Sequence, residues 1–541
     1  YYRFALAFLL AIAGLHSSCP GQETERPNFI VISIDDLGYA DIGAFGSTLN
    51  QTPHIDRMAA EGRKFTCFYA APVCSPSRSA LMTGCYPKRV LPIPGVLFPG
   101  AAVGVNPEEV TVAEVLKSAG YKTACIGKWH LGDQAAFLPT AQGFDYYLGI
   151  PYSNDMGTAA EGSKSDLGAP IPQPAKGSEK QAAAAPSTTD ETGLRGNQQP
   201  SLPLVENTRV IGTVAQDQQQ AIVETYTNAA VKFLKENKDE RFFLYLPHNA
   251  VHFPLYPGKN WVGKSGNGLY SDWIAEVDDS VGTILNTVRE LGIDRRTLIL
   301  FTSDNGGTPR AVNKPLRGFK GSTWEGGMRV PTIVWWPGVI PGGTQSDAIT
   351  GMMDVLPTFA GLSGAKLDET RRIDGMDLSK LLRGEAGAAG HDTFYYYHGL
   401  NLQAVRKGAW KLIPGTPAAN AQGNAAAKQE SNSKAAAKTE AGTPKKNSGK
   451  NVGNKNANKK NAAKTETPVG PQLYNLESDV AESMNVADAH PEIVAELMKL
   501  AEQMDDDLGR SGRGPGVRSL GRVANPEPFI RVDGTVREDA R

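Results

Sequence analysis

Short hydrophobic runs recur along the first two thirds of the chain, and segments with a helical spacing of apolar residues separate them. Runs of this length, rich in branched and aromatic residues, are typical of buried strands. Strands that alternate with helices indicate an α/β fold, in which helices cover both faces of a largely parallel sheet. The predicted strands are Asn28–Ile34, Lys122–Ile126, Phe242–Leu246, Thr297–Thr302 and Thr332–Trp336.

Polar residues and proline mark where two of the intervening helices begin. Thr52 followed by Pro53 predicts a helix start, because proline fits the first helical position, and Gly62 predicts the end of that helix. Thr111 and Glu114 have the spacing of a capping box, in which each side chain accepts a backbone hydrogen bond from the other residue. Local chemistry therefore sets the start of both helices.

A smaller unit is predicted towards the C-terminus. Ala404–Ile413 and Gln472–Leu476 have the character of strands, and Pro491–Met504 has helical spacing. We place the boundary near Arg383–Gly390, which gives a large domain over residues 27–385 and a smaller domain over residues 390–525.

Two segments interrupt these patterns. Residues 157–203 are rich in Ala, Ser, Gln, Gly and Pro, and we interpret them as a surface insertion of the large domain. Residues 415–470 are rich in Lys, Ala and Asn, with almost no large apolar residue, so they cannot bury enough surface to become ordered. We interpret them as a solvated, disordered loop; a tether for an anionic polysaccharide is the alternative.

Residues 1–22 are typical of a signal peptide and leader. Arg3 precedes the apolar run Phe4–Leu15, and Ala11-Ile12-Ala13 within it is a small-residue cleavage pattern. Cys19 leaves a lipid anchor as an alternative, but the residues before it fit a lipidation signal poorly. We therefore predict a secreted or periplasmic protein.

Composition and charge exclude two classes of partner. The chain has 541 residues, 40% of them hydrophobic, and a formal net charge of −1. A balanced charge gives no general attraction to nucleic acid or to a membrane surface. Beyond the N-terminus, no run is long and apolar enough to span a bilayer. We therefore expect no nucleic acid and no stable membrane span.

Four predicted strands run directly into polar residues that can carry out chemistry. In an open α/β sheet, ligands bind beyond the carboxyl ends of the strands. If these four strands are parallel neighbours, their end residues share one crevice. In chain order these residues are Asp35 and Asp36, Lys128 and His130, His248 and His252, and Asp304 and Asn305.

Two of these strand ends offer oxygen ligands. Asp35 and Asp36 follow one strand, and Asp304 and Asn305 follow another. Carboxylate and amide oxygens suit a hard cation, Ca²⁺ or Mg²⁺. An aspartate pair alone more often caps a turn, but two oxygen-donor pairs on two strands favour a metal site.

Cys74 opens a second motif, Cys74-Ser75-Pro76-Ser77-Arg78. Ser75 followed by Pro76 predicts a helix start with proline at the first helical position. Cys74 would then lie at the helix N-terminus, where free backbone N–H groups favour an anion. Arg78, one turn along, can fold back and help to bind sulfate or phosphate. A buried structural cysteine is the alternative.

The segment from Pro72 to Gly84 resembles the signature of the type I, formylglycine-dependent sulfatases throughout, and the segment from Gly120 to His130 resembles their second signature. Further similarity covers about residues 27–384 and 472–487, and is strongest to the arylsulfatase A and N-acetylgalactosamine-6-sulfatase branch. The resemblance implies an alkaline-phosphatase-like fold. Such a fold has a large mixed, mostly parallel sheet between helices, and a smaller C-terminal α+β domain built on an antiparallel sheet.

The resemblance implies that Cys74 is oxidised to formylglycine by a formylglycine-generating enzyme, which reads Pro76 and Arg78. A hydrated aldehyde carries two hydroxyl groups, so one can attack sulfur and the other can expel the sulfate. A thiolate would instead leave a stable adduct. The expected substrate is a sulfated small molecule or a sulfated glycan.

The resemblance also implies a role for each residue of the site. The metal ligands around Ca²⁺, with Mg²⁺ as the weaker candidate, are Asp35, Asp36, Asp304, Asn305 and the modified Cys74. The residues that bind charge or move protons are Arg78, Lys128, His130, His252 and Lys320, with Ser153 as a further residue of the substrate pocket. His248 remains an alternative to His252. Gly307 and Val251 stand where proline is common in this branch.

Two other functions compete with hydrolysis of an aryl or carbohydrate sulfate ester. Phosphatases and phosphodiesterases of the same superfamily use Thr or Ser with two zinc ions, and Asn305 stands where a zinc enzyme needs His. A non-catalytic protein that binds sulfated glycans would lack the nucleophile or the metal ligands, and this sequence keeps both.

Overall fold

The computed structural model describes residues 26–172, 191–415 and 470–541. The predicted signal peptide and nearly all of the predicted low-complexity loop lie outside the described residues. Among the described helices, none combines the length and the apolar character that crossing a bilayer requires.

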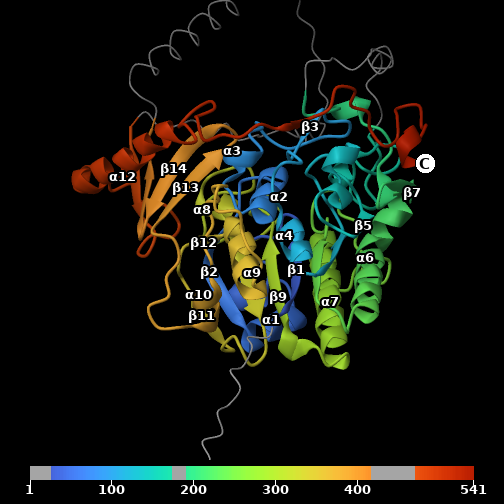
Figure 1. Cartoon of the computed structure of the whole chain (residues 1–541), viewed down its shortest axis with the longest axis horizontal. Helices are drawn as coiled ribbons and strands as arrows, with labels where there is room; N and C mark the ends of the chain where they lie inside the picture. Colours follow the sequence, from blue (N-terminus) through green and yellow to red (C-terminus); the bar gives the residue numbers. More distant parts are fainter. Residues whose placement is uncertain (1–25, 173–190, 416–469) are drawn as a thin grey trace, which may run out of the picture.

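A mixed sheet of eleven strands forms the centre of the described part of the molecule (Figure 1). Five neighbouring strands are parallel, in the order β9-β1-β8-β4-β5, and β10, β6 and β7 add antiparallel pairs. The α/β prediction is therefore confirmed. The strands are β1 (Asn28–Ile34), β2 (Arg63–Tyr69), β4 (Lys122–Ile126), β5 (Tyr146–Gly149), β6 (Pro203–Glu206), β7 (Arg209–Thr213), β8 (Phe242–Pro247), β9 (Thr297–Ser303), β10 (Arg329–Trp335), β11 (Thr344–Ser346) and β12 (Thr350–Gly351).

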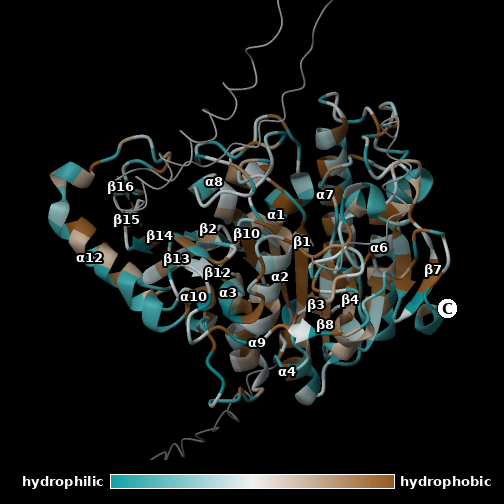
Figure 2. Ribbon diagram, turned by 90° about the horizontal axis from the view of Figure 1, so that it is seen from above, coloured by the Kyte–Doolittle hydropathy of each residue, from teal (hydrophilic) through white to brown (hydrophobic). Residues whose placement is uncertain are grey.

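Both faces of this sheet are buried under helices. Side chains alternate along a strand, so Phe29 and Val31 of β1 join one hydrophobic cluster while Ile30 and Ile32 join another. Figure 2 shows the hydrophobic residues concentrated along the central strands. The helices on the Phe29 side are α2 (Cys74–Thr83), α4 (Val112–Ser118) and α9 (Val355–Ser363), and those on the opposite side are α1 (Pro53–Glu61), α6 (Gln216–Glu236) and α7 (Leu269–Glu290).

Local signals placed α1 and α4 correctly. Helix α1 begins at Pro53 and ends before Gly62, as predicted. At α4, Glu114 N–H donates to Thr111 Oγ1 (3.2 Å) and Thr111 N–H donates to Glu114 Oε2 (2.7 Å), which completes the capping box. Strand β2 was not predicted, although it lies inside the sheet between β10 and β11.

A second, four-stranded antiparallel sheet lies beside the large one, and Figure 1 shows it in orange and red. The predicted single strand Ala404–Ile413 is wrong. It is a hairpin, because Gly408 has a φ of 53° and turns the chain back. The elements are β13 (Thr393–His398), β14 (Asn401–Lys407), β15 (Trp410–Ile413), β16 (Gln472–Asn475) and the helix α12 (Pro491–Gln503).

A cluster of buried charges joins the two sheets. Lys411 of β15 lies between Glu325 of the short helix α8 (Glu325–Met328) and Glu482, with N–O distances of 2.9 and 2.7 Å. All three side chains are fully buried. Tyr69 and Tyr396 donate their hydroxyls to Glu325 as well, so the charges in this cluster are surrounded by protein partners.

The C-terminal segment returns to the large sheet. Strand β17 (Gly521–Arg522) pairs with β3 (Val103–Gly104), and Phe529 is fully buried in the same hydrophobic cluster as Leu131. Gln134 and Glu527 exchange two hydrogen bonds, from Gln134 Nε2 to Glu527 O (3.0 Å) and from Glu527 N to Gln134 Oε1 (3.2 Å). Residues 521–541 therefore brace the loop that follows β4.

Candidate active site

The four strands whose ends carry polar residues are consecutive neighbours in the sheet. Their order is β9-β1-β8-β4, and every adjacent pair is parallel. Parallel neighbours bring their carboxyl ends to one edge, so the polar residues that follow these four strands gather at this edge. The position of these ends in the fold follows from topology alone.

The ends of β1 and β9 meet directly. The backbone N–H of Asp36 donates to Asp304 Oδ1 (3.3 Å), and Asn305 Nδ2 donates to Asp36 Oδ1 (2.7 Å). Asp35, Asp36, Asp304 and Asn305 are each at most 1% exposed. Buried carboxylates without compensation are costly, so this group needs cations around it.

One subset of these groups is close enough to hold a cation. Ligand atoms of Asp35, Asp36, Cys74 and His252 all lie within 4.8 Å of one another. Asn305 Oδ1 is buried without a hydrogen-bond partner among the described residues. Exchanging its amide oxygen and nitrogen turns that oxygen towards Asp36, which fits a hard cation bound there. Asp304 is not in the subset.

Cys74 lies at the first turn of α2. The helix begins at Cys74 itself, two residues earlier than the Ser75-Pro76 signal predicts, and Ser75 Oγ instead accepts a bond from Leu97 N–H (3.2 Å). Cys74 Sγ is 3.4 Å from both Asp35 Oδ1 and Lys320 Nζ. Burial, with Asp304 and Asp35 nearby, raises the pKa of the Cys74 thiol, so the thiol is protonated at neutral pH.

Arg78 folds back from the next turn of α2, and each nitrogen atom of its guanidinium bonds to a protein group. Its Nε and Nη2 lie 3.0 and 2.8 Å from Asp304 Oδ2, and its Nη1 donates to the Lys128 carbonyl (2.5 Å). These charge-assisted bonds tie α2 to the ends of β9 and β4. They occupy Asp304 Oδ2, while Asp304 Oδ1 accepts the bond from the backbone N–H of Asp36.

Two lysines and His252 surround the carboxylates. Lys128 Nζ bonds Asp35 and donates to Ser153 Oγ (3.1 Å), which is 3.3 Å from His252 Nδ1. Lys320 Nζ is 2.7 Å from Asp36 Oδ1. Burial alone would raise the pKa of Asp35, but Lys128, His252, Arg78 and Lys320 together lower it, so Asp35 is ionised.

Partial exposure shows which side of the group is open. Lys128 and Asp35 are fully buried, whereas the side chains of His252 and Lys320 are 12% and 18% exposed. A ligand therefore enters past His252 and Lys320. His248 is fully buried and its Nε2 is 3.3 Å from Ser280 Oγ of α7, so it lies away from this group.

His130 has one ring nitrogen free. Its Nε2 is 2.9 Å from the Leu97 carbonyl, which favours the tautomer that donates from Nε2. Its Nδ1 is buried without a partner among the described residues. Burial, with Lys128 and Arg78 nearby, lowers the pKa of His130 well below its ordinary value. A neutral imidazole with a free Nδ1 can accept a proton. Nothing in the sequence indicated that the Leu97 carbonyl would bond to His130.

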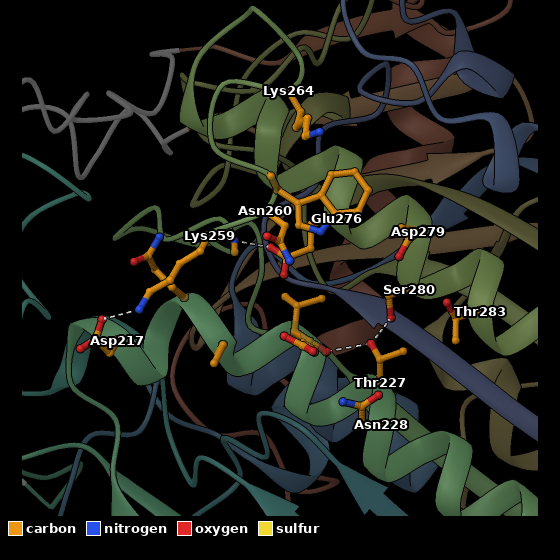
Figure 3. Close-up of a pocket in the computed structure, with 16 residues that line it drawn as sticks. Asp217, Thr227, Asn228, Lys259, Asn260, Lys264, Glu276, Asp279, Ser280 and Thr283 are labelled. Atoms are coloured by element: carbon orange, nitrogen blue, oxygen red, sulfur yellow. Dashed lines mark hydrogen bonds and ion pairs between the residues drawn. The ribbon is translucent and has the colours of Figure 1, made fainter.

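A cavity of about 790 Å³ lies elsewhere, between α6, α7 and the loop at residues 258–264 (Figure 3). None of the predicted site residues lines it. Its wall includes Glu276, whose Oε2 accepts a bond from Gly258 N–H (2.7 Å). Burial raises the pKa of Glu276 to about 8. This cavity is therefore separate from the predicted site.

Two family models match the chain. The model described as Sulfatase covers residues 27–365, and the model described as the C-terminal region of aryl-sulfatase covers residues 389–513. Human arylsulfatase A is 37% identical over 402 residues, which are 72% of this chain and 73% of the relative. Pig N-acetylgalactosamine-6-sulfatase is 33% identical over 433 residues, 76% of this chain and 75% of the relative.

Solved structures give the same result. PsFucS1 sulfatase from Pseudoalteromonas sp. is 25% identical with a TM-score of 0.70, over 92% of each chain. Ps i-CgsB, solved in complex with k-i-k-neocarrahexaose, is 28% identical with a TM-score of 0.65, over 88% of this chain and 92% of that one. The fold is thus the alkaline-phosphatase-like fold of these sulfatases. Together with the matched models, these similarities mean that the chain belongs to the sulfatase family and is a sulfuric ester hydrolase.

Proposed function

We propose that the protein hydrolyses an aryl or carbohydrate sulfate ester with a formylglycine made from Cys74 and a single Ca²⁺. The observation that carries the proposal is the position of Cys74. Its Sγ lies at the start of α2, 3.4 Å from the carboxylate of Asp35 and 3.4 Å from the ammonium of Lys320. A nucleophile at this point has a cation site on one side and a fixed positive charge on the other.

The donor set supports a hard cation. Asp35, Asp36 and Asn305, with Asp304 behind them, would hold Ca²⁺, and the ion would draw charge from a sulfate oxygen when bound. Mg²⁺ is the weaker candidate, because it usually keeps several waters and seldom takes an all-protein cage. The buried, unpartnered Oδ1 of Asn305 is the observation that fits a bound ion.

The hydrate of an aldehyde at position 74 would supply one hydroxyl to attack sulfur and a second to release the sulfate. The chain's own residues would then have four tasks. Lys128 and Lys320 hold positive charge beside position 74. Arg78 keeps α2 and Asp304 in place. His130 accepts a proton at Nδ1, and His252, held by Ser153, donates one towards the leaving oxygen at the open side.

Cys74 needs a formylglycine-generating enzyme as a partner, and the export signal at residues 1–22 supports a secreted or periplasmic location. A sulfated sugar is the favoured natural substrate. Two kinds of similar protein support this choice: the N-acetylgalactosamine-6-sulfatases by their name, and Ps i-CgsB by the neocarrahexaose in its solved complex.

Mass spectrometry of the peptide that contains Cys74 tests the proposal. The full chain is produced with and without a formylglycine-generating enzyme, and the aldehyde is trapped with a hydrazide. We expect activity on an aryl sulfate to rise in proportion to the aldehyde, and Cys74→Ala to abolish it. Cys125→Ala, which removes another buried free cysteine, is the matched control and keeps activity.

Full activity with an unmodified thiol at position 74 would contradict the proposal. Sulfate and phosphate esters of the same alcohol are assayed side by side, and a dominant phosphatase activity would also contradict it.

A further inference from the structure

One exposed arginine lies at the open side of the site and has no task in the chemistry above. Arg310 follows the Asp304-Asn305 pair on its loop, and this loop is joined to the loop of Lys320 by a hydrogen bond from Lys320 N–H to Gly307 O (3.0 Å). The guanidinium of Arg310 also lies over the ring of Phe253, 5.3 Å from its centroid. Phe253 is the neighbour of His252 in the chain. Arg310 is therefore linked to the segments of both residues at the entrance, His252 through Phe253 and Lys320 through the bonded loops.

Arg310 is held in one orientation by the segment 157–172. Its Nη1 is 2.8 Å from Asp166 Oδ2, and Asp166 Oδ1 accepts a bond from Leu255 N–H (2.9 Å). A backbone bond from Leu167 N–H to Leu255 O (3.0 Å) fixes the same contact. The guanidinium is therefore ordered before any ligand arrives, which lowers the entropic cost of binding.

Part of this side chain still faces solvent. The side chain of Arg310 is 44% exposed, and its Nε and Nη2 have no hydrogen-bond partner in the described part of the chain. An ion pair that served only to anchor the segment 157–172 would not need donors left open at the entrance. Two adjacent open donors match the two oxygens of a carboxylate or a sulfate.

An exposed aromatic ring lies on the neighbouring loop. Phe319 directly precedes Lys320 and is 43% exposed. It is the single aromatic among the large hydrophobic side chains that are exposed in the described ranges. An aromatic face beside a binding pocket offers an apolar surface to a sugar or aryl ring.

We propose that Arg310 and Phe319 form a recognition subsite for a substrate with a second anionic group besides the scissile sulfate. Phe319 packs against the ring, and Arg310 pairs with a carboxylate or a further sulfate on that ring or on the next sugar. The substrate class is therefore an acidic sulfated sugar. This inference rests on the proposed sulfate ester hydrolysis.

Steady-state kinetics on four substrates tests the subsite. The first is 4-nitrophenyl sulfate, which has no second anion. The others are sulfated amino-sugar disaccharides whose second sugar is a neutral hexose, a uronate or a sulfated hexose. In the unchanged enzyme we expect kcat/KM to be higher for the uronate or the second sulfate than for the neutral disaccharide, and the better of these two identifies the anion.

Arg310→Gln is expected to raise KM about 10-fold for that preferred disaccharide, since a charge-assisted bond contributes a factor of this order. KM for 4-nitrophenyl sulfate and for the neutral disaccharide is expected to change less than about 2-fold. Asp166→Asn, which releases Arg310, should shift the same KM in the same direction. Phe319→Ala should raise KM for all three disaccharides. Arg57→Gln is the matched control, because Arg57 is an exposed arginine of α1 paired with Glu61.

The subsite proposal is wrong if the unchanged enzyme has the same kcat/KM for neutral and acidic disaccharides. It is also wrong if the enzyme turns over neither kind of disaccharide. An equal effect of Arg310→Gln on every substrate overturns it as well, since that result indicates a structural role. Failure of the proposed function is a separate result: the formylglycine-containing enzyme would then turn over no sulfate ester, 4-nitrophenyl sulfate included.

Discussion

Two of the buried charge clusters in the described part of the molecule differ in how open they are to solvent. Around Lys411, the carboxylates Glu325 and Glu482 are fully buried and closed in by protein partners. Around Lys128, which is just as buried, one side is open through His252 and Lys320. Buried charge pairs alone therefore do not mark an active site. What distinguishes the cluster around Lys128 is its open side at His252 and Lys320.

The strongest test of this comparison replaces each lysine by methionine. Lys128→Met is expected to lower kcat on an aryl sulfate by about 10³, because a preorganised charge beside the reacting group is lost. Lys411→Met is expected to leave kcat within a few-fold but to lower the free energy of unfolding by about 3–5 kcal/mol, because two carboxylates stay buried without their cation. Denaturant unfolding and kinetics on the folded protein measure the two effects.

Each lysine variant serves as the control of the other. If Lys411→Met lost activity as strongly as Lys128→Met, the two clusters would not differ in function. If Lys128→Met were fully active, the proposed role of that charge would be wrong.

Removal of divalent cations should affect the cluster around Lys128 and not the cluster around Lys411. With a chelator, we expect reversible loss of activity and a decrease in the free energy of unfolding, about 2.7 kcal/mol if Ca²⁺ is at 100 times its dissociation constant. Asn305→Ala should weaken this response, and Lys411→Met should retain it. Thermal unfolding with and without Ca²⁺ measures the shift, and a chelator without effect on either readout would contradict the metal site.

Glu276, in the cavity between α6 and α7, offers a pH test away from both clusters. Burial raises its pKa to about 8 in the folded protein, against an ordinary value of 4.5. A raised pKa stabilises the fold below about pH 4.5, and this contribution is lost as the pH rises through about 8. Between about pH 5 and pH 8, Glu276→Gln should therefore lose less stability than the unchanged protein, by on the order of 3 kcal/mol. Equal pH profiles of unfolding would contradict the shift.

The smallest effect is expected at the C-terminal brace. Gln134→Ala removes two hydrogen bonds to the backbone of Glu527 and should cost about 1 kcal/mol of unfolding free energy. Because the braced loop follows His130, kcat should fall by a factor of about 2–3. Unchanged unfolding would show that residues 521–541 do not support this loop.

Local and periodic signals in the sequence predicted the centre of the site well. Strands β1 and β4 have the bounds that hydrophobic patterning predicted, and parallel order alone brought Asp35, Lys128 and Asp304 to one edge. The start of α2 was misplaced by two residues, because Ser75 Oγ bonds Leu97 and does not cap the helix.

Long-range contacts could not be read from the chain. The pairing of Arg78 with Asp304 joins residues 226 positions apart, and the anchoring of Arg310 by Asp166 joins residues 144 apart. The brace between Gln134 and Glu527 spans 393 positions. Such partners depend on how loops pack over the sheet, and no periodicity in the sequence encodes that packing.

Cys74 is only 2% exposed, and every residue of α2 around it is buried. A second protein cannot reach this thiol once the fold around it has formed. The proposed oxidation therefore has to take place on a chain that is still emerging or newly translocated. Timing during biosynthesis, and not affinity for the finished fold, would set the fraction of molecules that ever become active, and a copy that folds too early would stay inert for its lifetime.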